Sequence, residues 1–322
     1  MKKFFIKICK LFGFEIIDQN EFISPTLNKE LNKDLSILNK KSIVLPLGEV
    51  KITRKVTSIL IIVRVNTEIE VWDQNKRRLF EQPKIEYSIR SIKSLINSIN
   101  LCQNKYSGLK IKIIILDDSS KDKNLNRIKE IIKDTNGEII SLDIKKFENK
   151  IKKQKTQETF SNLASLLQCF EIGKEIGEDL IFFVEDDYLH FETMLEEMIT
   201  TYERVSSQVG KDIFMCPADY PYLYMNNEKT NILIGDKRHW RTINKTLCTF
   251  LTSKKLLDIY WENFLKNCED RHDPFEKYIN EIYKNEFCIS PLKSLSVHLT
   301  NVNSSYGLSP FINYKELWDQ NK

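Results

Sequence analysis

The sequence lacks several features that define common protein classes. Its seven cysteines are odd in number, scattered and without a CxxC pair, which excludes a disulfide framework and a zinc site and is typical of a reducing cytoplasm. It contains no GxGxxG or GxxxxGK(S/T) motif, which weighs against dinucleotide-dependent enzymes and P-loop NTPases. It has no internal repeat and no apolar run of membrane-spanning length, so we expect a globular cytoplasmic protein.

Charge is unevenly distributed along the chain. Its 322 residues include 49 basic and 45 acidic ones, and four lysines without any acid lie in residues 1–14. The remainder is therefore neutral and shows no footprint for nucleic acid. Residues 1–14 combine these lysines with apolar residues at helical spacing, but they are too short and too charged to span a membrane. We expect a helix that either lies on an anionic membrane surface or docks on its own domain.

Residues 15–55 are polar, and we expect an extended lead-in there. Apolar runs and helical periodicity then alternate along the chain. The predicted strands are 58–65, 111–116, 138–142, 180–184 and 212–216, and the predicted helices between them are 85–101, 124–132, 156–173 and 193–207. This rhythm indicates an α/β fold with a mostly parallel central sheet flanked by helices.

Carboxylates follow two of these strands. Asp117 and Asp118 follow the second strand, and the acids of residues 185–187 follow the fourth. Because α/β folds bind ligands at the carboxyl ends of parallel strands, we expect the two acidic tips to lie near each other. Adjacent carboxylates repel unless they are solvated or neutralised, and oxygen ligands favour Mg²⁺ or Mn²⁺. The alternative is an acidic turn that caps a helix beginning near Phe191.

Two polar segments have two interpretations each. Six lysines within residues 145–155 either steer an anionic substrate or form a solvated loop. Alternating tyrosines that include Tyr222 precede Trp240 and Arg241. Aromatic rings beside arginine form sugar-stacking surfaces, but the same residues also pack long loops.

With these motifs the chain resembles the GT-A glycosyltransferases, the sugar-nucleotide-dependent enzymes that include bacterial family 2. The resemblance covers roughly residues 58–300 and depends more on motif order than on identity. It implies a GT-A domain over residues 56–302, with a nucleotide-sugar-binding half at 56–190 and an acceptor-binding half at 191–302. Residues 303–322 are expected to form a C-terminal tail.

The segment LDDSS resembles the VDDGS motif, whose aspartate recognises the base of the donor. The resemblance implies this role for Asp117 or Asp118 without choosing between them, and Ser119 replaces the usual glycine. A carboxylate can accept a hydrogen bond from a base N–H. Arg64 and Asn66, at the end of the first strand, are expected to bind the donor as well.

The segment FFVEDDY is similar to the DxD motif that binds a divalent cation and, through it, the donor diphosphate. By this resemblance Asp187 is the main ligand of Mn²⁺ or Mg²⁺, and Asp186 and Glu185 assist in donor binding. His298 is a further candidate ligand, because some GT-A enzymes supply a late histidine and imidazole suits Mn²⁺ better than Mg²⁺.

The segment EDRHDPFEKY supplies candidate catalytic acids. Asp273, Pro274 and Glu276 have the pattern of a helix start, with an aspartate N-cap, proline at the first position and glutamate at the third. Family-2-type enzymes place a catalytic carboxylate at such a helix start. The resemblance therefore implies that Asp273 is the general base, with Glu276 and Asp270 as alternatives.

The function implied by the resemblance is a metal-dependent, inverting transfer of a sugar from a nucleotide-diphosphate donor to a hydroxyl of a glycan or glycolipid. Trp240, Arg241 and Tyr222 are the expected acceptor-binding residues. Attachment to the inner face of the cytoplasmic membrane is expected if residues 1–14 bind lipid.

Two alternative functions stay open. A sugar nucleotidylyltransferase shares the α/β layout, but the segment SILIIVRVNTEIEVW contains no glycine for a phosphate loop. A non-catalytic nucleotide-sugar- or carbohydrate-binding domain would bind the donor without turnover.

Overall fold

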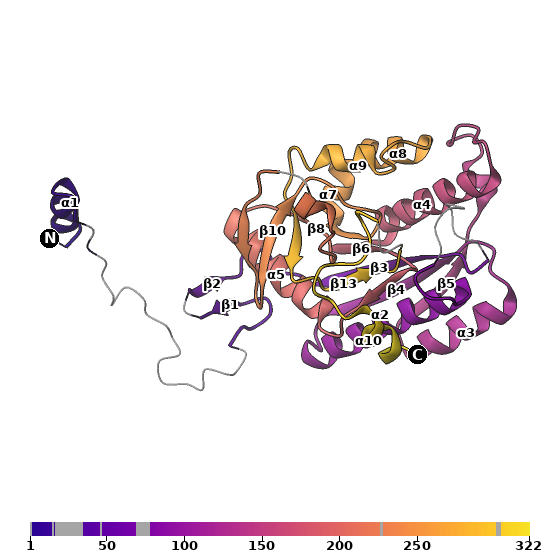
Figure 1. Ribbon diagram of the computed structural model, residues 1–322, viewed down its shortest axis with the longest axis horizontal. Helices are drawn as coiled ribbons and strands as arrows, with labels where there is room; N and C mark the ends of the chain where they lie inside the picture. The colour runs from indigo at the N-terminus through magenta and orange to yellow at the C-terminus, as the bar shows by residue number, and fades with distance from the viewer. Residues whose placement is uncertain are drawn as a thin grey trace.

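The described part of the chain, residues 2–14, 16, 35–45, 47–68, 78–225, 228–300 and 304–322 of a computed structural model, contains a central sheet of nine strands. These strands are β3 (Ser58–Val65), β4 (Lys110–Asp117), β5 (Gly137–Ser141), β6 (Leu180–Glu185), β8 (Phe214–Met215), β9 (Ile232–Ile234), β10 (His239–Ile243), β11 (Phe250–Ser253) and β12 (Cys288–Leu292). They lie in the order β5-β4-β3-β6-β11-β8-β12-β10-β9. Figure 1 labels β3, β4, β5 and β6 in the first half of this sheet and β8 and β10 in the second.

The first half of the sheet is parallel. β3 pairs with β4 on one side and with β6 on the other, and β4 pairs with β5. Aliphatic and aromatic side chains fill the three central strands and are buried on both faces, as in parallel sheets covered by helices. The register pairs Val65 with Asp117 and Arg64 with Glu185, so the acidic ends of β4 and β6 flank the end of β3.

The second half of the sheet is mixed. β11 pairs antiparallel with β6 and β8, β8 pairs parallel with β12, and β10 pairs antiparallel with β12 and β9. Seven of the nine strands in the described part of the chain therefore share one direction, and β10 and β11 oppose it. The expected α/β class with a mostly parallel sheet between helices is confirmed.

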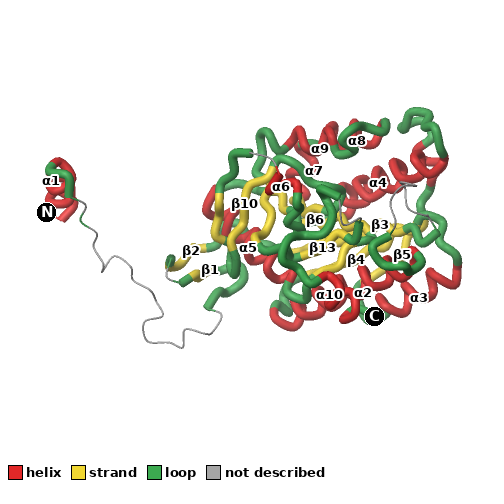
Figure 2. The backbone as a smooth tube through the Cα atoms, viewed as in Figure 1, coloured by secondary structure: helices red, strands yellow, loops and turns green. Residues whose placement is uncertain are grey.

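Helices cover both faces of this sheet (Figure 2). On one face lie α2 (Lys84–Lys105), α3 (Asp122–Ile132) and α5 (Met194–Val209), and on the other lie α4 (Gln157–Ile176), α7 (Lys254–Ile259), α8 (Trp261–Glu269) and α9 (Lys277–Ile282). Because side chains alternate along a strand, Ile61 packs in the first layer and Ile62 in the second. Two short helices, the 3-10 helix Ile144–Phe147 and α6 (Tyr222–Met225), lie in the connections.

Smaller elements attach to this core. β7 (Tyr188–His190) pairs antiparallel with β13 (Ser296–His298), and β1 (Lys41–Val44) pairs with β2 (Gly48–Lys51) beside α5. The C-terminal helix α10 (Tyr314–Gln320) packs Trp318 against Phe80 and against the guanidinium of Arg90 on α2. α1 (Lys2–Leu11) is drawn apart from these elements in Figure 1.

The strands and helices predicted between residues 58 and 207 are confirmed, with ends that differ by at most four residues. The strand predicted at 212–216 is shorter, because only Phe214 and Met215 pair with the neighbouring strands β11 and β12. The helix start predicted at Asp273 is wrong. α9 begins at Lys277, and the side chain of Glu276 is buried rather than used as a cap.

We expect Gly235→Ala to destabilise the fold, because a Cβ there would lie 2.4 Å from Nε1 of the buried Trp240 and 2.7 Å from Oγ1 of Thr201. Overpacking of this kind lowers the free energy of unfolding by about 1–3 kcal/mol. Gly108→Ala is the matched control, since its Cβ would meet nothing within 4 Å in the described structure. Urea unfolding measures both variants, and equal stabilities would contradict the expected clash.

Candidate active site at the strand ends

The acids of residues 185–187 lie between two strands rather than at the start of a helix. β6 ends at Glu185, and β7 begins at Tyr188 and pairs with β13. The next helix, α5, begins only at Met194. The helix-cap interpretation is therefore wrong, and each of the three acids instead faces a different basic side chain.

Glu185 is paired with Arg64. Oε1 of Glu185 accepts from Nη2 of Arg64 at 2.7 Å, and Nη1 of the same guanidinium donates to the backbone carbonyl of Asn162 on α4 at 3.0 Å. Burial raises the pKa of Glu185, and Arg64 opposes that rise. Burial also opposes the charge on Arg64, but Glu185 keeps its pKa above the usual value. The two charges neutralise each other, and the hydrogen bonds of Arg64 link β3 to β6 and α4.

Asp186 is held by the first turns of α2. Its Oδ1 lies 2.5 Å from Nζ of Lys84, and its Oδ2 accepts from the hydroxyl of Ser88. Both carboxylate oxygens therefore have partners from one helix. This arrangement anchors α2 to the turn between β6 and β7.

Asp187 faces His298, with Nε2 of the ring 3.2 Å from Oδ2. Nδ1 lies 2.8 Å from the carbonyl oxygen of Tyr306 and donates to it, so Nε2 of the neutral ring carries a lone pair. Burial favours the neutral ring, but Asp187 raises the pKa of His298. Burial likewise opposes the charge on Asp187, but His298 holds its pKa below the usual range. A proton or a cation is therefore needed between the two side chains.

A divalent cation fits this pair. Among the described residues Oδ1 of Asp187 is buried and has no hydrogen-bond partner. A carboxylate oxygen with an imidazole nitrogen is a donor set that suits Mn²⁺. No group of three His, Cys, Asp or Glu side chains in the described part of the chain is placed to hold a metal, so this site offers two protein ligands. A diphosphate and water would have to complete the coordination.

The two acids at the end of β4, Asp117 and Asp118, differ in what they contact. Oδ2 of Asp118 accepts from Nδ2 of Asn66 at 3.1 Å and from the hydroxyl of Ser161 on α4. Asp117 accepts one backbone N–H through Oδ2, whereas its buried Oδ1 has no partner within the described chain. Burial raises the pKa of Asp117, and the charge of Asp186 adds to this rise. The two acidic tips therefore lie near each other, as the sequence predicted.

The three candidate catalytic acids have different surroundings. Asp273 is exposed. Asp270 is half-buried and accepts from Gln154 at 3.1 Å, a bond that lowers its pKa. Glu276 is buried, and burial followed by the charge of Glu185 raises its pKa to about 8. Of the three, Glu276 is the one that interacts with the acidic cluster.

The predicted acceptor surface needs correction. Trp240 and Tyr222 are 0% and 3% exposed, so neither ring presents a face on which a sugar could stack. Arg241 is also buried, donates to the carbonyl of Leu223 at 2.9 Å and lies 5.1 Å from the ring centroid of Tyr224. The three side chains pack inside the fold as parts of α6 and β10, so they form neither a sugar-stacking surface nor a loop.

Three of the six lysines within residues 145–155 lie beside acids of their own chain. Lys146 and Lys150 pair with Glu171 at 2.6 and 2.5 Å, and Lys152 lies 3.6 Å from Asp270. These contacts favour the solvated-loop interpretation over steering of a substrate.

Sequence reasoning missed several polar residues around the site. Lys84 and Ser88 carry no motif, and their proximity to Asp186 depends on how α2 packs. Asp219 lies four residues after the end of β8, and an acid shortly after a strand is a signal that was present in the sequence. Asp219 is buried, accepts from the hydroxyl of Tyr224, and burial raises its pKa to about 6.

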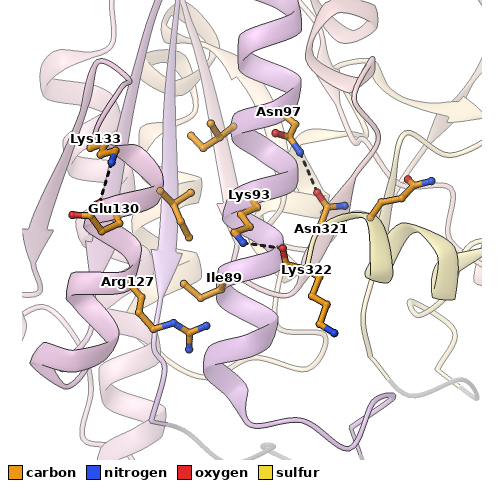
Figure 3. A pocket seen from close by; sticks show the side chains of 11 residues that line it. Ile89, Lys93, Asn97, Arg127, Glu130, Lys133, Asn321 and Lys322 are labelled. Carbon is orange, nitrogen blue, oxygen red and sulfur yellow. Dashed lines mark hydrogen bonds and ion pairs between the residues drawn. The ribbon is translucent and has the colours of Figure 1, made fainter.

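A separate groove lies between α2, α3 and the C-terminal residues (Figure 3). Its apolar floor includes Ile89, Ile96 and Ile131, and Lys93, Arg127 and Lys133 are among its charged lining. The groove shares none of its residues with the acidic site. It is therefore a second surface feature and not part of the candidate active site.

Solved structures match the chain, whereas no family model and no curated protein matches it. S. aureus TarS 1-349 is 12% identical with a TM-score of 0.35 and coverage of 63% of this chain and 48% of that one. An active-site mutant of LgtC is 13% identical with a TM-score of 0.38, and the match covers 72% of this chain and 71% of that one. A UDP-glucose pyrophosphorylase complexed with UDP-glucose is 10% identical with a TM-score of 0.37, and the match covers 83% of this chain and 97% of that one.

The chain thus spans about half the length of the TarS structure. The matches include the galactosyltransferase LgtC, from the class that the sequence resembles, and an inositol-1-phosphate CTP transferase. TM-scores below 0.5 at this identity support no choice of activity between them.

We expect the stability contributed by Glu276 to be lost as the pH rises. Its pKa is about 8 in the fold against 4.5 for an ordinary glutamate, so the folded state retains a proton that the unfolded state releases. The contribution is complete below pH 4.5 and disappears as the pH passes about 8, with a slope of up to about 1.4 kcal/mol per pH unit.

Urea unfolding as a function of pH tests this expectation. Glu276→Gln removes the titrating group. As the pH rises from about 5 to about 8, the free energy of unfolding of the wild type should therefore fall relative to that of the variant. Glu262→Gln, at an exposed position on α8, is the control and should follow the wild type. A constant difference between Glu276→Gln and the wild type would show that Glu276 is already ionised in the fold.

Proposed function

We propose that this protein is a metal-dependent glycosyltransferase that moves a sugar from a nucleotide-diphosphate donor to a hydroxyl of a glycan or glycolipid. The observation that carries the proposal is the facing pair Asp187 and His298, with a buried carboxylate oxygen to spare, at the ligand-binding edge of an α/β sheet. The enzyme is proposed to work in the cytoplasm at the inner face of the cytoplasmic membrane.

Asp117 is the proposed partner of the donor base. Its buried Oδ1 has no partner among the described residues and can accept a base N–H. Asp118 accepts a hydrogen bond from Asn66 and another from Ser161 on α4. These two residues therefore stabilise the backbone next to the proposed base site.

Asp187 and His298 are the proposed ligands of Mn²⁺ or Mg²⁺, which when bound neutralises charge on the leaving nucleoside diphosphate. Arg64 and Lys84 remain paired with the other two acids. Their positive charges reduce the repulsion that a cluster of carboxylates would exert on an incoming diphosphate. The chain therefore prepares the site for an anionic donor before any cation is bound.

Glu276 is the proposed general base, with Asp273 and Asp270 as alternatives. A base must be deprotonated to accept the proton of an acceptor hydroxyl, and a pKa of about 8 places this change near working pH. Attack of the hydroxyl on the face of the sugar opposite to the leaving group inverts the anomeric centre.

Donor binding is tested by calorimetric titration of UDP, GDP, CDP and dTDP with and without Mn²⁺. We expect one nucleotide to bind in a metal-dependent way, and Asp187→Asn to weaken it at least about tenfold, or about 1.4 kcal/mol. Asp258→Asn, an exposed carboxylate on α7, is the control.

The products formed from the matching sugar nucleotide separate the classes of function. Release of nucleoside diphosphate with an acceptor supports glycosyl transfer, and formation of nucleoside triphosphate with pyrophosphate would identify a nucleotidylyltransferase. Metal-dependent binding without either product would identify a binding domain. If none of the nucleotides binds in a metal-dependent way, the proposal is wrong.

We expect the rate of transfer to rise with pH towards a plateau above about 8, because Glu276 acts only when ionised. Glu276→Gln should lower kcat by about 10²-fold or more and remove this rise, whereas Asp273→Asn and Asp270→Asn should keep it. The pH dependence of kcat for the three variants makes the measurement. The opposite pattern, with activity lost only in Asp273→Asn, would assign the base to Asp273.

A further inference from the structure

The N-terminal helix α1 exposes an unusual amount of apolar surface. Phe4, Phe5, Leu11 and Phe12 are 70%, 61%, 85% and 73% exposed, and Phe14 just beyond the helix is 69% exposed. Elsewhere in the described chain, large exposed apolar residues are mostly single ones such as Ile176 and Phe311, which need no explanation. A concentration of this kind marks an interaction surface.

The helix separates its apolar and basic side chains. At about 3.6 residues per turn, Phe4, Ile8 and Leu11 follow one side of α1, and Lys7 and Lys10 lie together on another. α1 has ten residues, and no described helix is long and apolar enough to cross a membrane. The segment therefore has the pattern of a helix that lies in an interface rather than across it.

The charge of the segment specifies the kind of partner. Residues 1–14 contain four lysines and no acid, which equals the entire formal net charge of +4 of the protein. Lysines beside exposed phenylalanines match a bilayer that contains anionic lipids. The rings enter the boundary of the acyl chains, and the ammonium groups stay at the level of the headgroups.

The groove of Figure 3 is a poor site for α1 on its own domain. Its floor is apolar, but Lys93, Arg127 and Lys133 outnumber Glu130, the acidic side chain in its lining. A basic helix would meet like charges there. Charge complementarity thus favours a lipid surface over this docking site.

We propose that α1 binds the surface of an anionic lipid bilayer and holds the protein there. This inference rests on the membrane location in the proposed function and names the segment that provides the attachment, and it involves no residue of the acidic site. A single short helix binds reversibly, so the attraction depends on both apolar insertion and lysine charge.

Sedimentation of the full-length protein with lipid vesicles tests the proposal. We expect at least about tenfold stronger binding to vesicles of phosphatidylcholine mixed with phosphatidylglycerol than to phosphatidylcholine alone, and weaker binding as salt is added. Phe4→Ser with Phe12→Ser, and separately Lys7→Glu with Lys10→Glu, should each lower binding by a similar factor. Lys123→Glu with Lys129→Glu, exposed positions on α3, changes the net charge equally and should bind like the wild type.

Three results would overturn the proposal: no binding to either vesicle, equal loss of binding in the α3 control, or no effect of the α1 substitutions. Self-association that depends on Phe4 and Phe12 without lipid binding would assign α1 to a second copy of the chain instead. Nucleotide binding without lipid should be unchanged in every α1 variant. This readout separates failure of the membrane proposal from failure of the proposed enzymatic function.

Discussion

Compensation of carboxylate charge at one edge of the sheet is the constraint on which the site depends. The parallel register places the ends of β4 and β6 on either side of β3, which brings acids from both strands together. Burial of several carboxylates is unfavourable unless each has a charged or hydrogen-bonding partner. Arg64, Lys84 and His298 supply these partners from three different elements, so the packing of β3, α2 and β13 onto the sheet and the stability of the site are linked.

The partners also divide the acids into two groups. Asp118 and Asp186 engage side chains of neighbouring elements and brace the fold. Asp117 and Asp187 each keep one buried oxygen without a partner among the described residues, and these are the oxygens proposed to bind a base and a cation. Similar residue types at adjacent positions thus have different roles, because their surroundings differ.

The neutral body and the basic N-terminal helix have separable tasks. The acidic site needs local charge compensation, which ion pairs within the body provide. α1 carries the net positive charge of the protein together with exposed rings, which fits contact with an anionic surface. The proposed weak attachment would raise the concentration of the protein near the proposed glycolipid acceptor without changing the chemistry of the site.

The sequence by itself determined the α/β class, most strand and helix positions and the two acidic tips, because hydrophobic periodicity and strand-end acids are local signals. Tertiary structure alone decided what each polar residue does. Lys84 and Asp186 are 102 positions apart and Asp187 and His298 are 111 apart, so no spacing rule could pair them. The burial of Trp240 and Glu276 could not be predicted either, because the exposure of an aromatic ring or a carboxylate is decided by the neighbours that pack against it.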